Sequence, residues 1–174
     1  MMRNTTHTIR SRRAQGFSAL ELMAVLILVA IFAALALPSF DGTLKRYRVD
    51  AAASSVASAL QFARSEAIRT GTAVSVAGGS CAPGLSRNCS VNVLDTQGTK
   101  LKTISEDSFK GLNIEFPRTD IIYSPLGIFQ GSNTENAISL WPVGSDSAQD
   151  SPYASKVCPG ASGRVRVVAS SAAC

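Results

Sequence analysis

The chain has 174 residues, of which 45% are hydrophobic and 17% are charged, and its formal net charge is +5 at neutral pH. This length suits one domain with a short extra segment, and this composition excludes a wholly disordered protein. Four of the 17 basic residues lie within residues 1–16, which contain no acid, and the rest of the chain holds 13 basic and 12 acidic side chains. Overall charge therefore does not indicate a nucleic-acid-binding protein, and any basic site must be local.

A polar, basic segment, residues 1–16, precedes an apolar stretch, residues 17–40, whose single charged side chain is Glu21. At about 1.5 Å per residue, a helix over residues 17–37 is about 30 Å long, enough to span the hydrocarbon core of a bilayer. The basic flank predicts a cytoplasmic N-terminus. An ionisable group within such a segment indicates a functional site.

A secretory signal peptide is the main alternative for this segment, because Ala34-Leu35-Ala36 fits an A-x-A cleavage site. The apolar stretch is, however, longer than the roughly 7–15 residues of a signal-peptide core. A glutamate near its start is also unusual for a peptide that is discarded.

The pattern of Gly16, Phe17 and Glu21 after a basic leader resembles the class III leader of type IV pilins and type II secretion pseudopilins. The resemblance implies that a prepilin peptidase cuts after Gly16 and N-methylates Phe17. It also implies that Glu21, the fifth mature residue, pairs with the N-terminal amine of a neighbouring pilin or pseudopilin. The implied location is the inner membrane, with residues 17–40 as a single transmembrane and filament-core helix and residues 41–174 as a periplasmic domain.

Pro38 lacks a backbone donor and clashes with the preceding turn, so we expect the helix to kink or loosen there and at Asp41-Gly42. A helical pattern resumes over about residues 43–70 and is predicted to stop at Gly71. Apolar residues recur every three or four positions on one face of this segment: Val49, Ala52, Val56, Leu60, Ala63 and Ala67. The basic cluster at residues 45–48 is better explained as a solvated helix face near lipid headgroups than as a DNA or membrane site.

Residues 63–67 read Ala-Arg-Ser-Glu-Ala, which resembles a segment of the GspH/FimT branch of minor pilins and pseudopilins. The resemblance implies a pilin-like α+β fold, in which the long N-terminal helix packs on an antiparallel β-sheet head. We expect this motif to serve packing and surface salt pairing.

From Thr72 the pattern changes to short strands. Residues 73–77 and 90–94 alternate with period two around a loop, which predicts a hairpin. Turns are predicted at residues 95–98 and 124–127, the second of which resembles the Pro-x-Gly turn of the same family. Further strands are expected at residues 100–104, 112–116, 120–123, 137–141 and 163–169, with a surface loop at 144–155. Short strands with turn signals favour antiparallel sheets.

Four cysteines follow the apolar segment, and three pairings are possible. Their spacing favours Cys81–Cys89 and Cys158–Cys174, each closing a short loop, and does not fit the close pairs of a zinc site. An oxidising periplasm would support these disulfides, with free thiols as the alternative.

The last predicted strand carries Gly163-Arg164-Val165-Arg166. On a strand, both arginines project from one face while the valines face the core, and Lys156 lies nearby in sequence. Adjacent guanidinium groups can bind successive phosphates bidentately. The motif resembles the Gly-Arg-x-Arg of FimT-type minor pilins, which implies binding of double-stranded DNA at the pilus tip during natural transformation. Such binding would be sequence-independent and salt-dependent. An ordinary exposed strand is the alternative.

Enzymatic functions are not indicated. The one histidine, His7, lies in the leader, and no phosphate loop or nucleophile elbow is present. Asp146 and Asp150 match no calcium loop. We therefore expect no catalytic residues, no metal and no cofactor in a protein that is itself a substrate of prepilin peptidase.

Two functions remain. Both imply the same partners, namely other pilins or pseudopilins, prepilin peptidase and the inner membrane. The first is a minor type IV pilin that primes pilus assembly and binds DNA through the C-terminal arginines. The second is a GspH-like minor pseudopilin of a type II secretion system. A weaker third possibility is a membrane-anchored binding module that joins no filament.

Overall fold

The computed structural model describes residues 18–79, 84–87, 89–117, 120–131 and 136–174, with only the backbone given for residues 35–39 and 84–87. By internal contacts the chain divides into two compact units, Met1–Phe40 and Asp41–Cys174. The second unit is called the head below. Within the described part of the chain, no helical stretch combines the length and apolar character that a membrane crossing needs.

The helix α1 runs from Ala19 to Thr70 without interruption. At its start, the Oγ of Ser18 accepts a hydrogen bond from the N–H of Leu20 (3.3 Å), as an N-cap residue does. At its end, Gly71 adopts φ +66° and donates its N–H to the carbonyl of Ala67 (3.0 Å). This left-handed glycine cap confirms the predicted helix stop.

The predicted resumption of the helix at about residue 43 is wrong, because the helical backbone continues through Pro38, Asp41 and Gly42. The expected kink stays a prediction. A proline removes one backbone donor, but its fixed φ of about −65° is already helical. A long helix can therefore include it, at the cost of one hydrogen bond and of the clash with the preceding turn.

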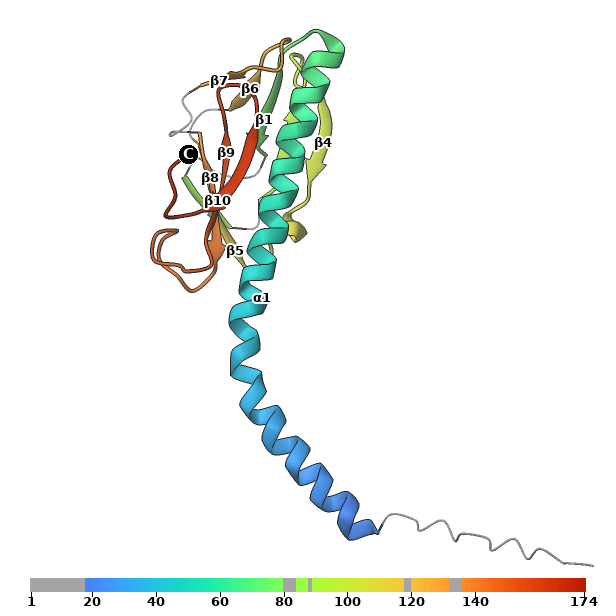
Figure 1. The fold of residues 1–174 in the computed structure, drawn as a ribbon. Coiled ribbons are helices and arrows are strands. Elements are labelled where there is room, and N and C mark those ends of the chain that lie inside the picture. Colours follow the sequence, from blue (N-terminus) through green and yellow to red (C-terminus); the bar gives the residue numbers. More distant parts are fainter. Residues whose placement is uncertain (1–17, 80–83, 88, 118–119, 132–135) are drawn as a thin grey trace, which may run out of the picture. The chain divides into compact units, whose positions relative to one another are not determined.

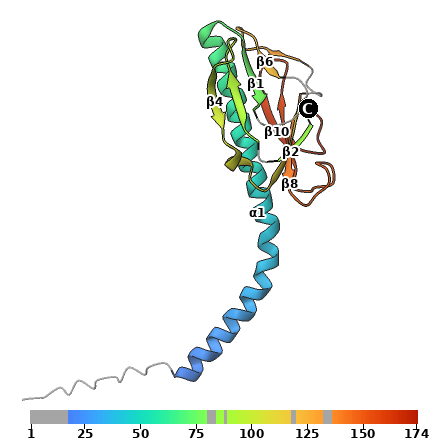
Figure 2. The ribbon, with the colours of Figure 1, turned by 180° about the vertical axis from the view of Figure 1, so that it is seen from behind.

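The head contains two antiparallel five-stranded sheets, ordered β4-β3-β1-β6-β7 and β10-β9-β8-β5-β2 (Figures 1 and 2). The strands of the first sheet are β1 (Val74–Gly78), β3 (Val91–Leu94), β4 (Lys100–Ile104), β6 (Ile121–Tyr123) and β7 (Phe129–Gln130). Those of the second are β2 (Gly84–Arg87), β5 (Leu112–Phe116), β8 (Ile138–Pro142), β9 (Ser155–Pro159) and β10 (Val165–Ala169). A short 3-10 helix, η1 (Glu106–Phe109), precedes β5.

One core joins the C-terminal half of α1 to both sheets. All six residues of the predicted apolar helix face are buried, none more than 2% exposed. They pack with residues from the first sheet, such as Val76 and Ile121, and from the second, such as Ile114 and Leu140. The predicted α+β architecture, a long helix on antiparallel sheets, is therefore confirmed.

The predicted hairpin is present, since β1 pairs with β3 in register from Ser75↔Leu94 to Gly78↔Val91. The chain between them was expected to be a loop but also contains β2, which pairs with β5 in the other sheet. The strands β7 and β9 were not predicted either. β7 has two residues, and β9 includes Ser155, Lys156 and Pro159, which are weak strand formers.

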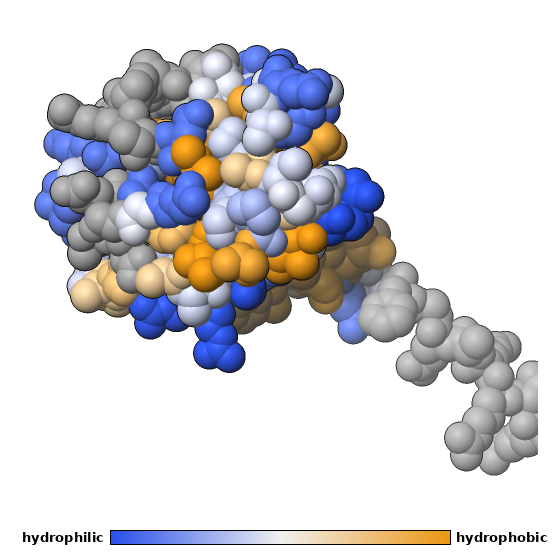
Figure 3. Space-filling view, turned by 90° about the horizontal axis from the view of Figure 1, so that it is seen from above, coloured by the Kyte–Doolittle hydropathy of each residue, from blue (hydrophilic) through white to orange (hydrophobic). Residues whose placement is uncertain are grey.

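The end of the head where α1 stops carries an apolar patch among hydrophilic residues (Figure 3). Three exposed apolar side chains belong to the segments at this end: Ile68 of α1, and Leu126 and Ile128 of the β6–β7 connection. An added Cβ at Gly127 would lie 2.6 Å from Cδ1 of Ile68. The turn therefore packs closely on the last turns of α1.

Candidate nucleic-acid interface

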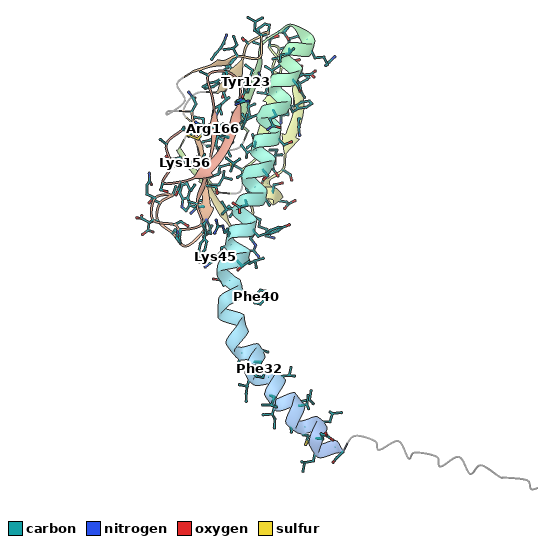
Figure 4. The ribbon with its side chains drawn as sticks, in the orientation of Figure 1. Phe32, Phe40, Lys45, Tyr123, Lys156 and Arg166 are labelled. Carbon is teal, nitrogen blue, oxygen red and sulfur yellow. A yellow bond between two sulfur atoms is a disulfide. The ribbon has the colours of Figure 1, made fainter. Side chains whose placement is uncertain are left out.

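The strand β10 forms one edge of the second sheet and pairs with β9. Its register places Arg166 opposite Cys158 and Val168 opposite Lys156. Directly opposed residues of an antiparallel pair share a face, so Arg166 and Lys156 project from the same side of the sheet. Figure 4 shows them on neighbouring strands.

The other face of β10 turns toward the core, as the alternation predicts. Val165 packs against the core cluster, and Val157 of β9, which lies opposite Val167, is fully buried. Val167 departs from the prediction because it is 45% exposed. The core therefore supports the first half of the strand and leaves the rest at the surface.

Arg164 lies just before β10, in the turn that joins it to β9, and not within the predicted strand. The N–H of Gly160 donates to the Arg164 carbonyl (2.6 Å), and the N–H of Gly163 donates to the Gly160 carbonyl (2.8 Å). Gly163 adopts φ +77°, a conformation that favours glycine. This turn holds the exposed Arg164 on a hydrogen-bonded backbone.

The C-terminal tail lies against the face of Arg166. A disulfide joins Cys158 and Cys174, with a Cα–Cα distance of 5.5 Å, as predicted. The Nη2 of Arg166 donates to the Cys174 carbonyl at 2.7 Å. Cys89 is also disulfide-bonded, whereas its predicted partner, Cys81, lies outside the described residues. The tail thus orients Arg166 and uses one of its five donors.

Among the residues that the structure describes, no Asp or Glu side chain forms an ion pair with Lys156, Arg164 or Arg166. The ion pairs there join Lys45 to Asp41 (2.7 Å) and Arg69 to Glu66. The hydrogen bond from Arg69 lowers the pKa of Glu66, and the hydrogen bond to Asp41 raises the pKa of Lys45. The charges of the three candidate residues are therefore available to an external anion.

The structure adds a residue that the sequence did not indicate. Arg64, from the Ala-Arg-Ser-Glu-Ala segment of α1, donates from Nε to the carbonyl of Gly127 (3.0 Å). A Cβ added at Gly163 would lie 2.1 Å from that carbonyl oxygen and 2.6 Å from Nε of Arg64. The helix motif, the β6–β7 turn and the Gly-Arg-Val-Arg motif therefore meet at one point.

This meeting point has one weak signal in the sequence. Glycine is required where backbone and side chain approach this closely. Gly127 ends the predicted turn at residues 124–127, and Gly163 follows Pro159-Gly160. The expected salt pairing of the helix motif is present as Glu66–Arg69. The position of Arg64 had no such signal.

Tyr123, on β6, is fully buried and is labelled in Figure 4. Its hydroxyl has no hydrogen-bond partner within the described part of the chain. Burial raises its pKa to about 12, with the charge of Arg64 acting in the opposite direction. The phenol is therefore neutral at physiological pH.

The predicted assembly residues lie at the other end of the chain. Gly16 and Phe17 are outside the described residues, and Glu21 occupies the first turn of α1. A carboxylate there interacts favourably with the N-terminal end of the helix dipole. Cleavage, methylation and subunit pairing remain predictions.

Comparison with known proteins identifies the family. Residues 52–172 match the family described as Type II transport protein GspH. The chain belongs to the GspH family. GspH-family proteins are minor pilins or pseudopilins of type IV pili or type II secretion systems, which are structural subunits and not enzymes. No curated protein is significantly similar to the chain in sequence.

Two solved structures of the Pseudomonas aeruginosa type IV minor pilin FimU share the fold of this GspH-family chain. One has 19% sequence identity and a TM-score of 0.55, and the match covers 74% of this chain and 94% of FimU. The other, from a second crystal form, has 18% identity and a TM-score of 0.52, and covers 72% and 96%. At this identity the likeness establishes a pilin-like fold alone.

Proposed function

We propose that this GspH-family subunit is a minor type IV pilin that is anchored in the inner membrane, enters the pilus and binds double-stranded DNA through its β9–β10 turn. One observation carries the DNA function. Arg164 and Arg166 are exposed at a sheet edge, beside Lys156, with no acidic partner among the described residues. No Asp or Glu follows Asp150 in the sequence.

The chemistry of these groups suits a phosphate backbone. A guanidinium group binds a phosphate through two parallel hydrogen bonds, and it stays charged at any physiological pH. The hydrogen-bonded turn and the disulfide-anchored tail restrict the backbone around both arginines, which reduces the entropy lost on binding. Phosphate contacts carry no sequence information, so the proposed binding is independent of DNA sequence.

The DNA function is tested with Arg164→Gln/Arg166→Gln. The matched control is Lys100→Gln/Lys102→Gln, which removes the same charge from the edge strand of the other sheet. We expect the arginine variant to bind duplex DNA at least about tenfold more weakly at low salt, and its log–log salt slope to fall by about 2. The lysine variant should bind like the wild type. If the two variants lost DNA affinity equally, the loss would reflect net charge alone, and this result would contradict the proposal.

Assembly rests on the leader motif. In cells with active prepilin peptidase, Gly16→Val should remain at full length, and the wild type should lose residues 1–16. Replacement of Glu21 by Gln should leave processing intact and reduce the amount of subunit in sheared pili, because the partner of the N-terminal amine is lost. Normal trimming of Gly16→Val would refute the leader assignment.

The alternative is a minor pseudopilin of a type II secretion system, and the name of the matching family favours it. The two functions predict opposite phenotypes for a deletion strain. Loss of twitching or DNA uptake with normal exoprotein secretion supports the pilus. Loss of secretion with normal pili assigns the protein to type II secretion.

A further inference from the structure

Arg64 extends the candidate DNA site to a second element of the fold. We propose that its guanidinium group supplies a further phosphate contact, from the helix side of the β9–β10 turn, to the same DNA backbone that Arg164 binds. This inference rests on the proposed DNA function. It adds a residue 100 positions away from Arg164 in the chain.

The contacts of Arg64 fix its guanidinium plane without consuming its binding capacity. Its Nε donates to the Gly127 carbonyl at 3.0 Å, which leaves the four N–H groups of Nη1 and Nη2. The Tyr123 hydroxyl is the buried side-chain polar atom without a partner in the described part of the head. Arg64 is half-buried, and its terminal nitrogens are not among the buried atoms without a partner. They can therefore form the bidentate contact that arginine makes with phosphate.

The β6–β7 turn, whose Gly127 carbonyl accepts the hydrogen bond from Arg64, is itself held by backbone hydrogen bonds. Gly127 adopts φ +71°, and its N–H donates to the Ser124 carbonyl at 2.8 Å. The N–H of Ser124 donates in turn to the Ile128 carbonyl at 2.9 Å. The Gly127 carbonyl is thus a fixed acceptor, and Arg64 is held by it in one orientation.

Gly163 brings Arg64 next to the arginine motif. Its missing Cβ leaves the space that Nε of Arg64 occupies, and Arg164 is the next residue along the chain. Gly163 and Val165 face the helix, whereas Arg166 shares the opposite face with Lys156. Cations therefore flank the β9–β10 turn on both sides, with Arg164 in the turn between them.

The charges around Arg64 favour the binding of an anion. The carboxylate closest to Arg64 in sequence, Glu66, is held by Arg69. Arg64 itself forms no ion pair among the described residues. Duplex DNA presents one phosphate charge per about 1.7 Å of its axis, so a backbone that crosses the turn offers a phosphate to each side.

The test separates a phosphate contact from a purely structural role. Binding of two unrelated DNA duplexes is measured over a range of salt concentrations for full-length chains purified in a nonionic detergent. All chains carry Arg3→Gln, Arg10→Gln, Arg12→Gln and Arg13→Gln, because the four leader arginines would add their own phosphate contacts. The variants are Arg64→Gln, Arg64→Lys, Arg164→Gln and the control Lys100→Gln.

We expect Arg64→Gln to lower the log–log salt slope by about 0.9, as Arg164→Gln does, and Arg64→Lys and Lys100→Gln to keep the wild-type slope. Partial unfolding of a variant would weaken binding equally at all salt concentrations and leave the slope unchanged. A wild-type slope in Arg64→Gln therefore overturns the inference, whatever its affinity. If Arg164→Gln lowers the slope and Arg64→Gln does not, only this inference fails; if no chain binds DNA, the proposed function fails as well.

Discussion

Two edge strands of the head, β4 in the first sheet and β10 in the second, have nearly the same local sequence pattern. Each edge strand follows a turn with a left-handed glycine, Gly98 at φ +79° and Gly163 at φ +77°. Each then presents two basic residues at alternate positions: Lys100 and Lys102 at β4, and Arg164 and Arg166 at β10. Local pattern alone would assign both edges the same role.

Their tertiary contacts are different. At β4, Nζ of Lys102 lies 5.3 Å from the ring centroid of Phe62, so this cation is directed inward onto α1. Gly98 has no atom within 4 Å of an added Cβ. At β10, Gly163 is in close contact with Arg64 and Gly127, and a disulfide anchors the tail beside Arg166. The β4 cation serves packing, whereas the β10 cations are held outward by neighbouring elements.

Removing the disulfide should make the β10 edge resemble the β4 edge. We expect Cys158→Ser/Cys174→Ser to lower the free energy of unfolding by about 3 kcal/mol, because a bond closing a loop of this size restricts the unfolded chain by about that amount. The sequence separation is 16 residues. Chemical denaturation followed by fluorescence of Trp141, the single tryptophan, measures the loss. A loss below about 1 kcal/mol would show that the disulfide does not stabilise this edge.

The two glycines provide a matched pair. Gly98→Ala should cost about 1 kcal/mol, the conformational penalty of a left-handed alanine. Gly163→Ala should cost about 2 kcal/mol more, because its Cβ would overlap the Gly127 carbonyl oxygen and force the turn to shift. Unfolding curves of the two variants under identical conditions give the difference. If the two variants lost the same free energy of unfolding, the Gly127 carbonyl and the Arg64 side chain would have moved away from the added Cβ without strain.

The cation at the β4 edge should contribute to stability and not to DNA binding. Lys102→Gln should lower the free energy of unfolding by about 0.5–1 kcal/mol through loss of its contact with the Phe62 ring. Lys100→Gln, on the same strand, should change it by less than about 0.5 kcal/mol. A larger effect for Lys100→Gln would contradict the assignment of Lys102 as the packed cation.

The smallest expected effect is a pH dependence confined to the β4 edge. Hydrogen bonds from the backbone of Thr99 and Gln97 (both 2.8 Å) lower the pKa of Asp95 below its ordinary value of 3.8, with Thr99 the larger cause. A lowered pKa stabilises the fold above the unfolded-state value, and this stabilisation disappears as the pH falls through the folded-state value. The stability difference between the wild type and Asp95→Asn should therefore be present at pH 7 and vanish in acid.

The turn before β10 supplies the contrast for this measurement. Residues 160–164 contain no carboxylate, so Ser162→Ala should change stability by the same small amount at both pH values. A difference between wild type and Asp95→Asn that persists in acid would mean that the Asp95 carboxylate acts through something other than its charge.

Several features were determined by the sequence because they depend on neighbours along the chain. The apolar face of α1 follows from residue spacing. The helix stop at Gly71 and the turn at residues 95–98 follow from a conformation that glycine adopts without strain. The pairing of Cys158 with Cys174 follows from their short separation. The alternation of arginine and valine likewise indicated that Val165 turns to the core, but it did not predict the exposure of Val167.

Other features were decided by tertiary structure alone. The contact between Arg64 and Gly127 joins residues 63 positions apart, and no local pattern specifies such a pair. The strand β9 has a weak intrinsic preference for its conformation and forms because β8 and β10 pair with it on both sides. The difference between the β4 and β10 edges has the same origin: similar local sequences acquire different roles from the elements that pack against them.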